Sequence, residues 1–155
     1  MRSAPASGIK INSYPKEYRL LKHADYDRVY KQGRRHFSPI MTFFYLERPS
    51  SATVAHVHDK ARVGITVGRA LGCAVVRNRI KRRMREAVRA HMAEFCAAPH
   101  PLVDVVINPK KIVLSAEFSQ VLAEVGRGFS QIRRQLALTV GNQLAHSANR
   151  PETAR

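Results

Sequence analysis

The residues best equipped for chemistry are the cations between Arg77 and Arg85, where six of nine positions are Lys or Arg. Guanidinium and ammonium groups at this density are typical of surfaces that bind phosphate. Apolar residues spaced three and four apart run through the same segment from Val76 to Phe95, and this period predicts a helix with one buried stripe. At about 100° per residue, four polar side chains lie opposite that stripe: Asn78, Arg82, Arg85 and Arg89.

Like charges repeat four residues apart along this predicted helix, as at Arg77, Lys81 and Arg85, with Glu86 nearby as a counter-charge. Each such pair costs a few tenths of a kcal/mol, roughly 0.2–0.5. The whole chain carries a net charge of +16. A self-repelling helix on so basic a protein predicts a polyanionic partner. We expect nucleic acid and no membrane, because no apolar stretch reaches the ~20 residues of a membrane span and no Trp, Phe or Leu borders the charged face.

Three aromatic residues could stack on unpaired bases. Tyr26 and Tyr30 lie four apart on a short helix predicted at 23–32, and Phe44 lies on one face of a strand predicted at 40–47. A base stacked on such a ring contributes roughly 1–3 kcal/mol. The competing interpretation is that these rings pack in the protein core.

Metal binding and catalysis find less support in the residue pattern. His56, His58 and Asp59 are competent ligands, but they fall in a predicted loop and lack the further ligands that a site needs. Cys73 and Cys96 have no metal-ligand spacing, and we expect two reduced thiols. No paired carboxylates, nucleophile arrangement or phosphate-binding glycine loop stands out. We therefore expect no catalytic residue and no metal site. The two reduced thiols are typical of a cytoplasmic protein, and we expect that location.

The elements that position these residues are predicted from periodicity and turn signals. Helices are expected at 23–32 and 74–95, and a third from Ser115 as N-cap, with Glu117 in its first turn, to about residue 138. Strands are expected at 34–38, 40–47, 62–67 and 103–108. The order helix, strands, helix, strand, helix predicts one α+β domain, a two-layer α/β sandwich. Its limits are 18–140, between flexible segments at 1–17 and 141–155.

The run from Gly72 to Glu86 resembles the signature of the protein subunit of bacterial ribonuclease P, with its Arg-Asn-Arg core at residues 77–79. Residues 25–33, 62–67 and 105–107 resemble further blocks of that family in the same order. The chain departs from the family pattern in the turn before the helix. Gly68 and Ala70 flank Arg69 where Ser-Lys-Lys is usual, and Cys73 replaces a common Asn.

The resemblance implies a ribosomal-protein-like fold with a left-handed βαβ crossover. It also implies a subunit that performs no catalysis, because in this family a catalytic RNA with bound Mg²⁺ removes the 5′ leader of precursor tRNA. Tyr26, Tyr30 and Phe44 would then contact the leader, and no cofactor would be bound by the protein itself. The partners would be one catalytic RNA per protein and the precursor tRNA. The implied RNA-binding residues are Arg69, Arg77, Asn78, Arg79, Lys81, Arg82, Arg85 and Arg89.

Two alternatives stay open at this point. A general or ribosomal RNA-binding protein would share the charge pattern without a role in tRNA processing. A stand-alone metal hydrolase using His56, His58 and Asp59 would act without any RNA.

Overall fold

The computed structural model describes residues 15–49, 60–97 and 101–148. Its centre is a four-stranded sheet in the order β1-β2-β4-β3. The strands are β1 (Arg34–Phe37), β2 (Met41–Glu47), β3 (Arg62–Ile65) and β4 (Val103–Pro109). Neighbouring strands are antiparallel except β3 and β4, which are parallel and joined through the long helix α2 (Ala74–Phe95).

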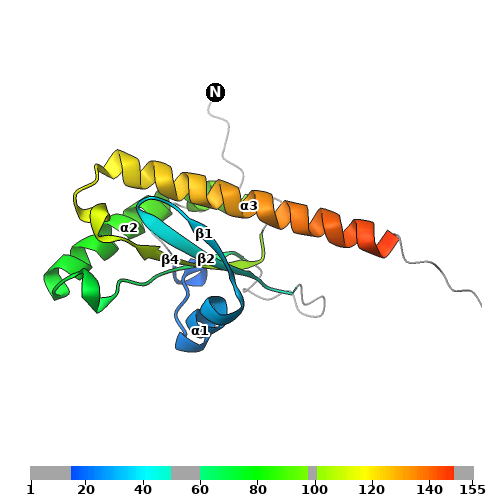
Figure 1. The fold of residues 1–155 in the computed structure, drawn as a ribbon, viewed down its shortest axis with the longest axis horizontal. Helices are drawn as coiled ribbons and strands as arrows, with labels where there is room; N and C mark the ends of the chain where they lie inside the picture. Colours follow the sequence, from blue (N-terminus) through cyan, green and yellow to red (C-terminus); the bar gives the residue numbers. More distant parts are fainter. Residues whose placement is uncertain (1–14, 50–59, 98–100, 149–155) are drawn as a thin grey trace, which may run out of the picture.

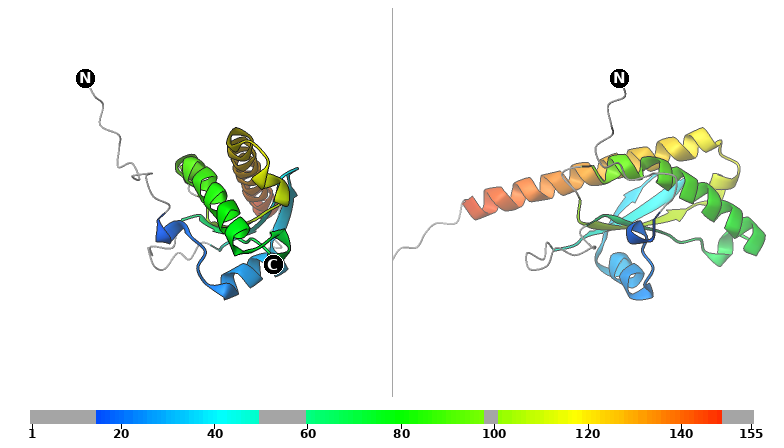
Figure 2. Two further views of the ribbon diagram at one scale, coloured as in Figure 1. Left: turned by 90° about the vertical axis from the view of Figure 1, so that its left-hand side faces the viewer. Right: turned by 180° about the vertical axis from the view of Figure 1, so that it is seen from behind.

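Helices cover both faces of this sheet (Figure 1). α1 (His23–Gln32) lies on one face, while α2 and α3 (Phe118–Ala148) lie side by side on the other (Figure 2). The predicted α+β class and order of elements are confirmed. α1 adds a third layer, because strands β2 and β4 carry apolar residues on both faces.

Alternation along β2 divides the apolar residues between the two faces. Met41, Phe43 and Tyr45 are buried in the main core beneath α2 and α3. Phe44 and Leu46 point the other way and pack against a small second cluster beneath α1, which contains Leu20, Val29 and Val106. The sheet is thus closed on one side by a large core and on the other by a small one.

An ion network fixes α1 to the sheet at the end where β2 stops and β3 begins. Asp104 on β4 is fully buried and accepts two bonds from Arg62, at 2.8 and 2.7 Å. Arg28 of α1 donates to the same carboxylate at 3.1 Å, and Arg48 lies 3.1 Å from it. Burial tends to lower the pKa of Arg62, but its bonds to Asp104 and the charge of Asp25 outweigh burial and raise it. A buried carboxylate with this many cationic partners is satisfied, and its loss is costly.

The helix bounds of α1 and α2 agree with the prediction, whereas α3 differs at both ends. The predicted N-cap at Ser115 is wrong, because a short 3-10 helix, η3 (Lys111–Leu114), precedes α3 and Ser115 ends it. The Ser115 hydroxyl donates back to the Ile112 carbonyl, and Ser115 lies three residues before Phe118, too early to be the N-cap of α3. α3 then continues to Ala148, past the predicted end near 138 and into the segment expected as a tail, since good helix formers such as Leu and Ala continue there.

Candidate nucleic-acid interface

α2 presents its cations as predicted, on a helix anchored by an apolar stripe. Residues spaced three and four apart on its inner side are buried: Ile80, Met84, Ala87, Val88, Met92 and Phe95. On the outer side four predicted RNA-binding residues are exposed: Asn78, Arg79, Arg82 and Arg85. Arg77, Lys81 and Arg89 are partly exposed, and Arg89 donates to Glu86 at 2.6 Å. Arg69 is exposed on the short 3-10 helix η2 (Arg69–Leu71), just before α2.

One cation of the run serves the fold. Arg83 donates to the carbonyl oxygens of Val113, Leu114 and Ala116 at 2.6, 3.1 and 2.7 Å. It therefore ties α2 to η3 and to the start of α3. The sequence shows Arg83 only as one more cation, since its carbonyl partners lie 30 to 33 residues away.

The turn into α2 depends on a glycine and ends on a thiol. Gly72 has φ of 142°, a conformation that other residues rarely adopt. Cys73 follows at the N-cap and is exposed. The backbone amides of Val76 and Val75 and the charge of Arg77 lower the pKa of the Cys73 thiol. The start of α2 is thus a locus of positive potential, as expected where free amides and a guanidinium meet.

The predicted aromatic residues come together on the α1 face of the sheet. Tyr30 meets Phe44 edge-on, with ring centroids 4.9 Å apart. The Tyr30 hydroxyl donates to Asn108 Oδ1 at 2.7 Å, and the Tyr26 hydroxyl donates to the Leu20 carbonyl at 3.0 Å. All three rings are partly buried against the second core cluster and partly exposed. The packing interpretation therefore applies to all three rings, and stacking of a base on their exposed parts stays a prediction.

Gly64 and Arg85 set the surroundings of Tyr26. A Cβ at Gly64 would come within 2.5 Å of the Tyr26 hydroxyl oxygen, so the ring rests directly on the β3 backbone. Burial and the neighbouring Tyr30 raise the pKa of Tyr26, while a bond with the Ile65 backbone and the charge of Arg85 act in the opposite sense. β3 leads into α2 through η2 and packs against that helix, so the two predicted contact surfaces meet at this strand.

Sequence reasoning missed two members of this face. Asn108 belongs to it because alternation along β4 places it beside Val106 on the α1 side. Arg35 belongs to it because its guanidinium lies over the Phe44 ring, 5.3 Å from the centroid. The period-2 pattern of strands β1 and β4 could have indicated both residues.

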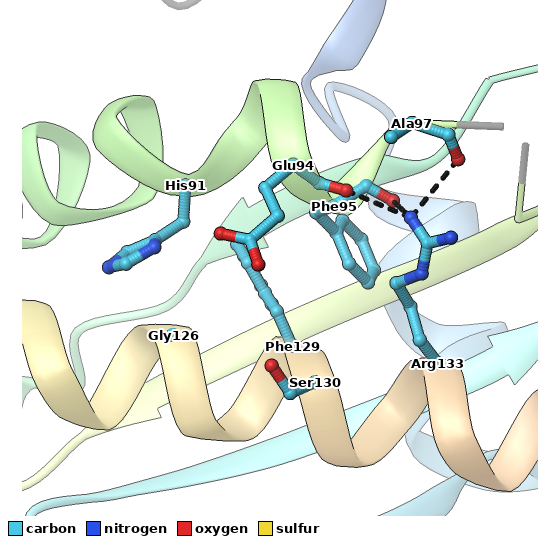
Figure 3. A pocket seen from close by; sticks show the side chains of 8 residues that line it. All are labelled: His91, Glu94, Phe95, Ala97, Gly126, Phe129, Ser130 and Arg133. Atoms are coloured by element: carbon cyan, nitrogen blue, oxygen red, sulfur yellow. Dashed lines mark hydrogen bonds between the residues drawn. The ribbon is translucent and has the colours of Figure 1, made fainter.

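A hollow of about 370 Å³ lies between α2 and α3 on the opposite face of the sheet (Figure 3). Its polar groups hold the helices together: Arg133 donates to the carbonyls of Glu94, Phe95 and Ala97 at 2.8, 2.9 and 3.0 Å. Phe95 also stacks on Phe129 with centroids 4.2 Å apart. These residues therefore join α2 to α3.

The expected absence of a metal site is untested for its main candidates. His56, His58 and Asp59 lie outside the described residues. Within residues 15–49, 60–97 and 101–148, no group of three or more His, Cys, Asp or Glu side chains is placed to hold a metal ion. Over the same ranges, every helix is too short or too polar to cross a bilayer.

Comparison with known proteins gives a consistent result. A sequence model of the family described as Ribonuclease P matches residues 14–133. The ribonuclease P protein component of Brucella melitensis biotype 1 is 37% identical over 110 residues, which are 70% of this chain and 75% of that protein. The corresponding protein of Maridesulfovibrio salexigens is 34% identical over 112 residues, 72% of this chain and 82% of that protein.

Solved structures show a similar fold. The Staphylococcus aureus RNase P protein has a TM-score of 0.56 at 25% identity, over 75% of this chain and 94% of that one. The RNase P protein from Thermotoga maritima has a TM-score of 0.58 at 23% identity, over 73% of this chain and 96% of that one.

Proposed function

This chain belongs to the ribonuclease P protein family, and on that basis we propose how it acts as the protein component of this tRNA-processing endoribonuclease. It binds the RNase P RNA through the exposed cations of α2, and it holds the 5′ leader of precursor tRNA on the aromatic face beneath α1. Bond cleavage belongs to the RNA, and the chain contributes binding and orientation. The complex contains one protein per RNA and works in the cytoplasm.

The observation that carries this proposal is the adjacency of two chemically different surfaces. α2 offers guanidinium groups on a rigid, anchored helix, and such groups bind phosphates bidentately. The face with Tyr30 and Phe44 offers rings with free edges, which suit unpaired bases. β3 joins the two, since the Tyr26 ring rests on Gly64 of β3, and α2 follows β3 in the chain and packs against it. A structured RNA and a single strand emerging from it would occupy both surfaces together.

The cationic face also explains how a protein of this size could assist a metal-dependent RNA. Arg79, Arg82 and Arg85 are exposed and fixed at helical spacing. They would neutralise RNA phosphates that otherwise require counterions. The Mg²⁺ ions expected in the holoenzyme would be held by RNA oxygens, and the protein would lower the Mg²⁺ concentration at which the complex works.

Reconstitution tests the proposal. The purified chain is mixed with a bacterial RNase P RNA and a leader-bearing precursor tRNA at low Mg²⁺, and release of the leader is followed. We expect strong stimulation over the RNA alone, lost in the double variant Arg82→Gln/Arg85→Gln. Arg127→Gln/Arg134→Gln is the matched control, because it removes the same charge from exposed positions on α3, outside both α2 and the aromatic face.

A second comparison separates the leader contact from RNA binding. Phe44→Leu keeps an apolar side chain in the small core but removes the aromatic ring, and it should weaken affinity only for substrates with a long leader. If the chain binds unrelated structured RNAs equally well and does not stimulate cleavage, it is a general RNA-binding protein and the proposal fails.

A further inference from the structure

The edge strand β1 carries an aromatic ring on the same side of the sheet as the proposed leader site. Phe37 is 68% exposed. Single exposed apolar residues are common and need no explanation on their own. The neighbours of Phe37 make its position informative.

Strand register places Phe37 beside the aromatic cluster. β1 pairs with β2 so that Arg35 lies opposite Phe44 and Phe37 lies opposite Thr42. Side chains directly opposite share a face of the sheet, so Arg35, Phe37 and Phe44 all lie on the α1 side. His36, between them in sequence, lies on the other side, 5.8 Å from the Phe43 ring.

The spacing between Phe37 and Phe44 suits a planar base inserted between the two rings. The two residues are diagonal neighbours across an antiparallel pair, a relation that separates their Cβ atoms by about 7–8 Å. That is about twice the ~3.4 Å rise of stacked bases, so one base fits between two rings at this separation. Direct stacking of the two rings on each other would need a shorter distance.

Arg35 and Lys110 supply charge at the same corner. The Arg35 guanidinium lies over the Phe44 ring at 5.3 Å, within the range of a cation–π contact. Its planar group can stack on a base or bind a phosphate. Lys110 donates to the Ser38 carbonyl at 3.0 Å, which holds a second cation one residue beyond Phe37.

We propose that the surface for single-stranded RNA continues from Phe44 onto β1, where Phe37 and Arg35 hold one further unpaired nucleotide of the precursor. This inference rests on the proposed function. The proposed contacts run across the sheet from Tyr26 of α1, whose ring rests on Gly64 of β3, through Tyr30 and Phe44 to the edge strand β1. β1 and β3 are the two ends of the sheet order, and α2 follows β3. The nucleotide at Phe37 is therefore the one farthest from the catalytic RNA on α2.

Leader-length dependence in the holoenzyme tests this position. Precursor tRNAs with leaders of about one to ten nucleotides are bound to complexes with wild-type protein, Phe37→Ala, Phe37→Tyr or Phe44→Leu. We expect Phe37→Ala to lower affinity about 5-fold or more for long leaders, the low end for one stacked base, and to leave the shortest leader unaffected. Phe37→Tyr keeps the ring and should behave as wild type.

The variants distinguish failure of this inference from failure of the proposed function. If Phe44→Leu abolishes the gain from a longer leader and Phe37→Ala does not alter it, the extension onto β1 is wrong. If Phe37→Ala weakens the shortest-leader substrate equally, Phe37 contacts another part of the complex and the inference is again wrong. If neither variant changes the length dependence, the leader site itself is wrong.

A fluorescent base gives an independent readout. 2-Aminopurine placed at successive leader positions is quenched where it stacks on a ring. Phe37→Ala should relieve quenching at one position, on the distal side of the position that responds to Phe44→Leu. Relief at every position or at none would overturn the assignment.

Discussion

Replacing Arg82 and Arg83 by Gln, one at a time, separates the charge on α2 that binds RNA from the charge that holds the protein together. Arg82 is exposed on the outer side of the helix. Arg83 is partly buried and donates to three backbone carbonyls of residues 113–116. Each variant removes one positive charge from the same turn, so differences between them cannot come from net charge.

The structure sets the size of both effects. A hydrogen bond to a charged group contributes about 1.5–3 kcal/mol, and three bonds from one half-buried side chain are not additive, so we expect Arg83→Gln to cost roughly 2–4 kcal/mol. At about 2–4 °C per kcal/mol for a chain of this size, the Tm should fall by roughly 4–16 °C. Arg82→Gln should change stability by less than about 0.5 kcal/mol.

In RNA binding, the larger effect should come from Arg82→Gln and the smaller from Arg83→Gln. Each phosphate contact contributes about 0.7–0.9 to the slope of log Kd against log salt concentration. Arg82→Gln should lower that slope for RNase P RNA by about this amount. Arg83→Gln, measured well below its Tm, should leave the slope unchanged. If Arg83→Gln reduces the slope and leaves the Tm unchanged, the structural role assigned to Arg83 from its hydrogen bonds is wrong.

Three further predictions concern the fold and the turn into α2. Asp104→Asn should lower the free energy of unfolding by about 3–5 kcal/mol in denaturant titrations, because it leaves buried guanidinium groups without their counter-charge. Gly64→Ala should displace the phenol ring that rests on it and weaken binding of leader-bearing substrate, whereas Gly68→Ala, with open space around it, should not. The thiol of Cys73 has a lowered pKa and should be alkylated rapidly at neutral pH. Burial raises the pKa of Cys96 to about 11, so its alkylation should require unfolding.

The parts of the fold that sequence predicted are those with local signals. α2 has 22 residues of unbroken helical period, and α1 ends at Gly33, so both helices have the predicted bounds. The start of α3 was mispredicted because Ser115 has the residue type of an N-cap but sits at the end of η3. η3 is held by Arg83 from a distant helix, and a single sequence does not display such a contact.

The candidate site likewise has features that local sequence patterns predict and features that depend on tertiary contacts. The cationic face and the strand face that holds Phe44 follow from periods of 3.6 and 2, which are local properties. Which arginine is tied to carbonyl oxygens is a tertiary property and was not predictable. The same holds for the bond from Tyr30 to Asn108, which joins residues 78 apart in sequence.

The ion network around Asp104 holds α1 on the sheet without requiring the helix to cover the aromatic face. A helix packed over the whole sheet face would bury Phe44 and close the surface to a ligand. α1 instead rests on the small cluster of Leu20, Val29 and Val106, which cannot fix a helix as firmly as the core under α2 and α3. Charge supplies the missing constraint, because Arg28 of α1 binds the buried Asp104 near the start of β4. Tyr30, bonded to Asn108 near the end of β4, and Phe44 stay partly exposed. The position of the aromatic face should therefore depend on Asp104, even though that carboxylate touches no ligand.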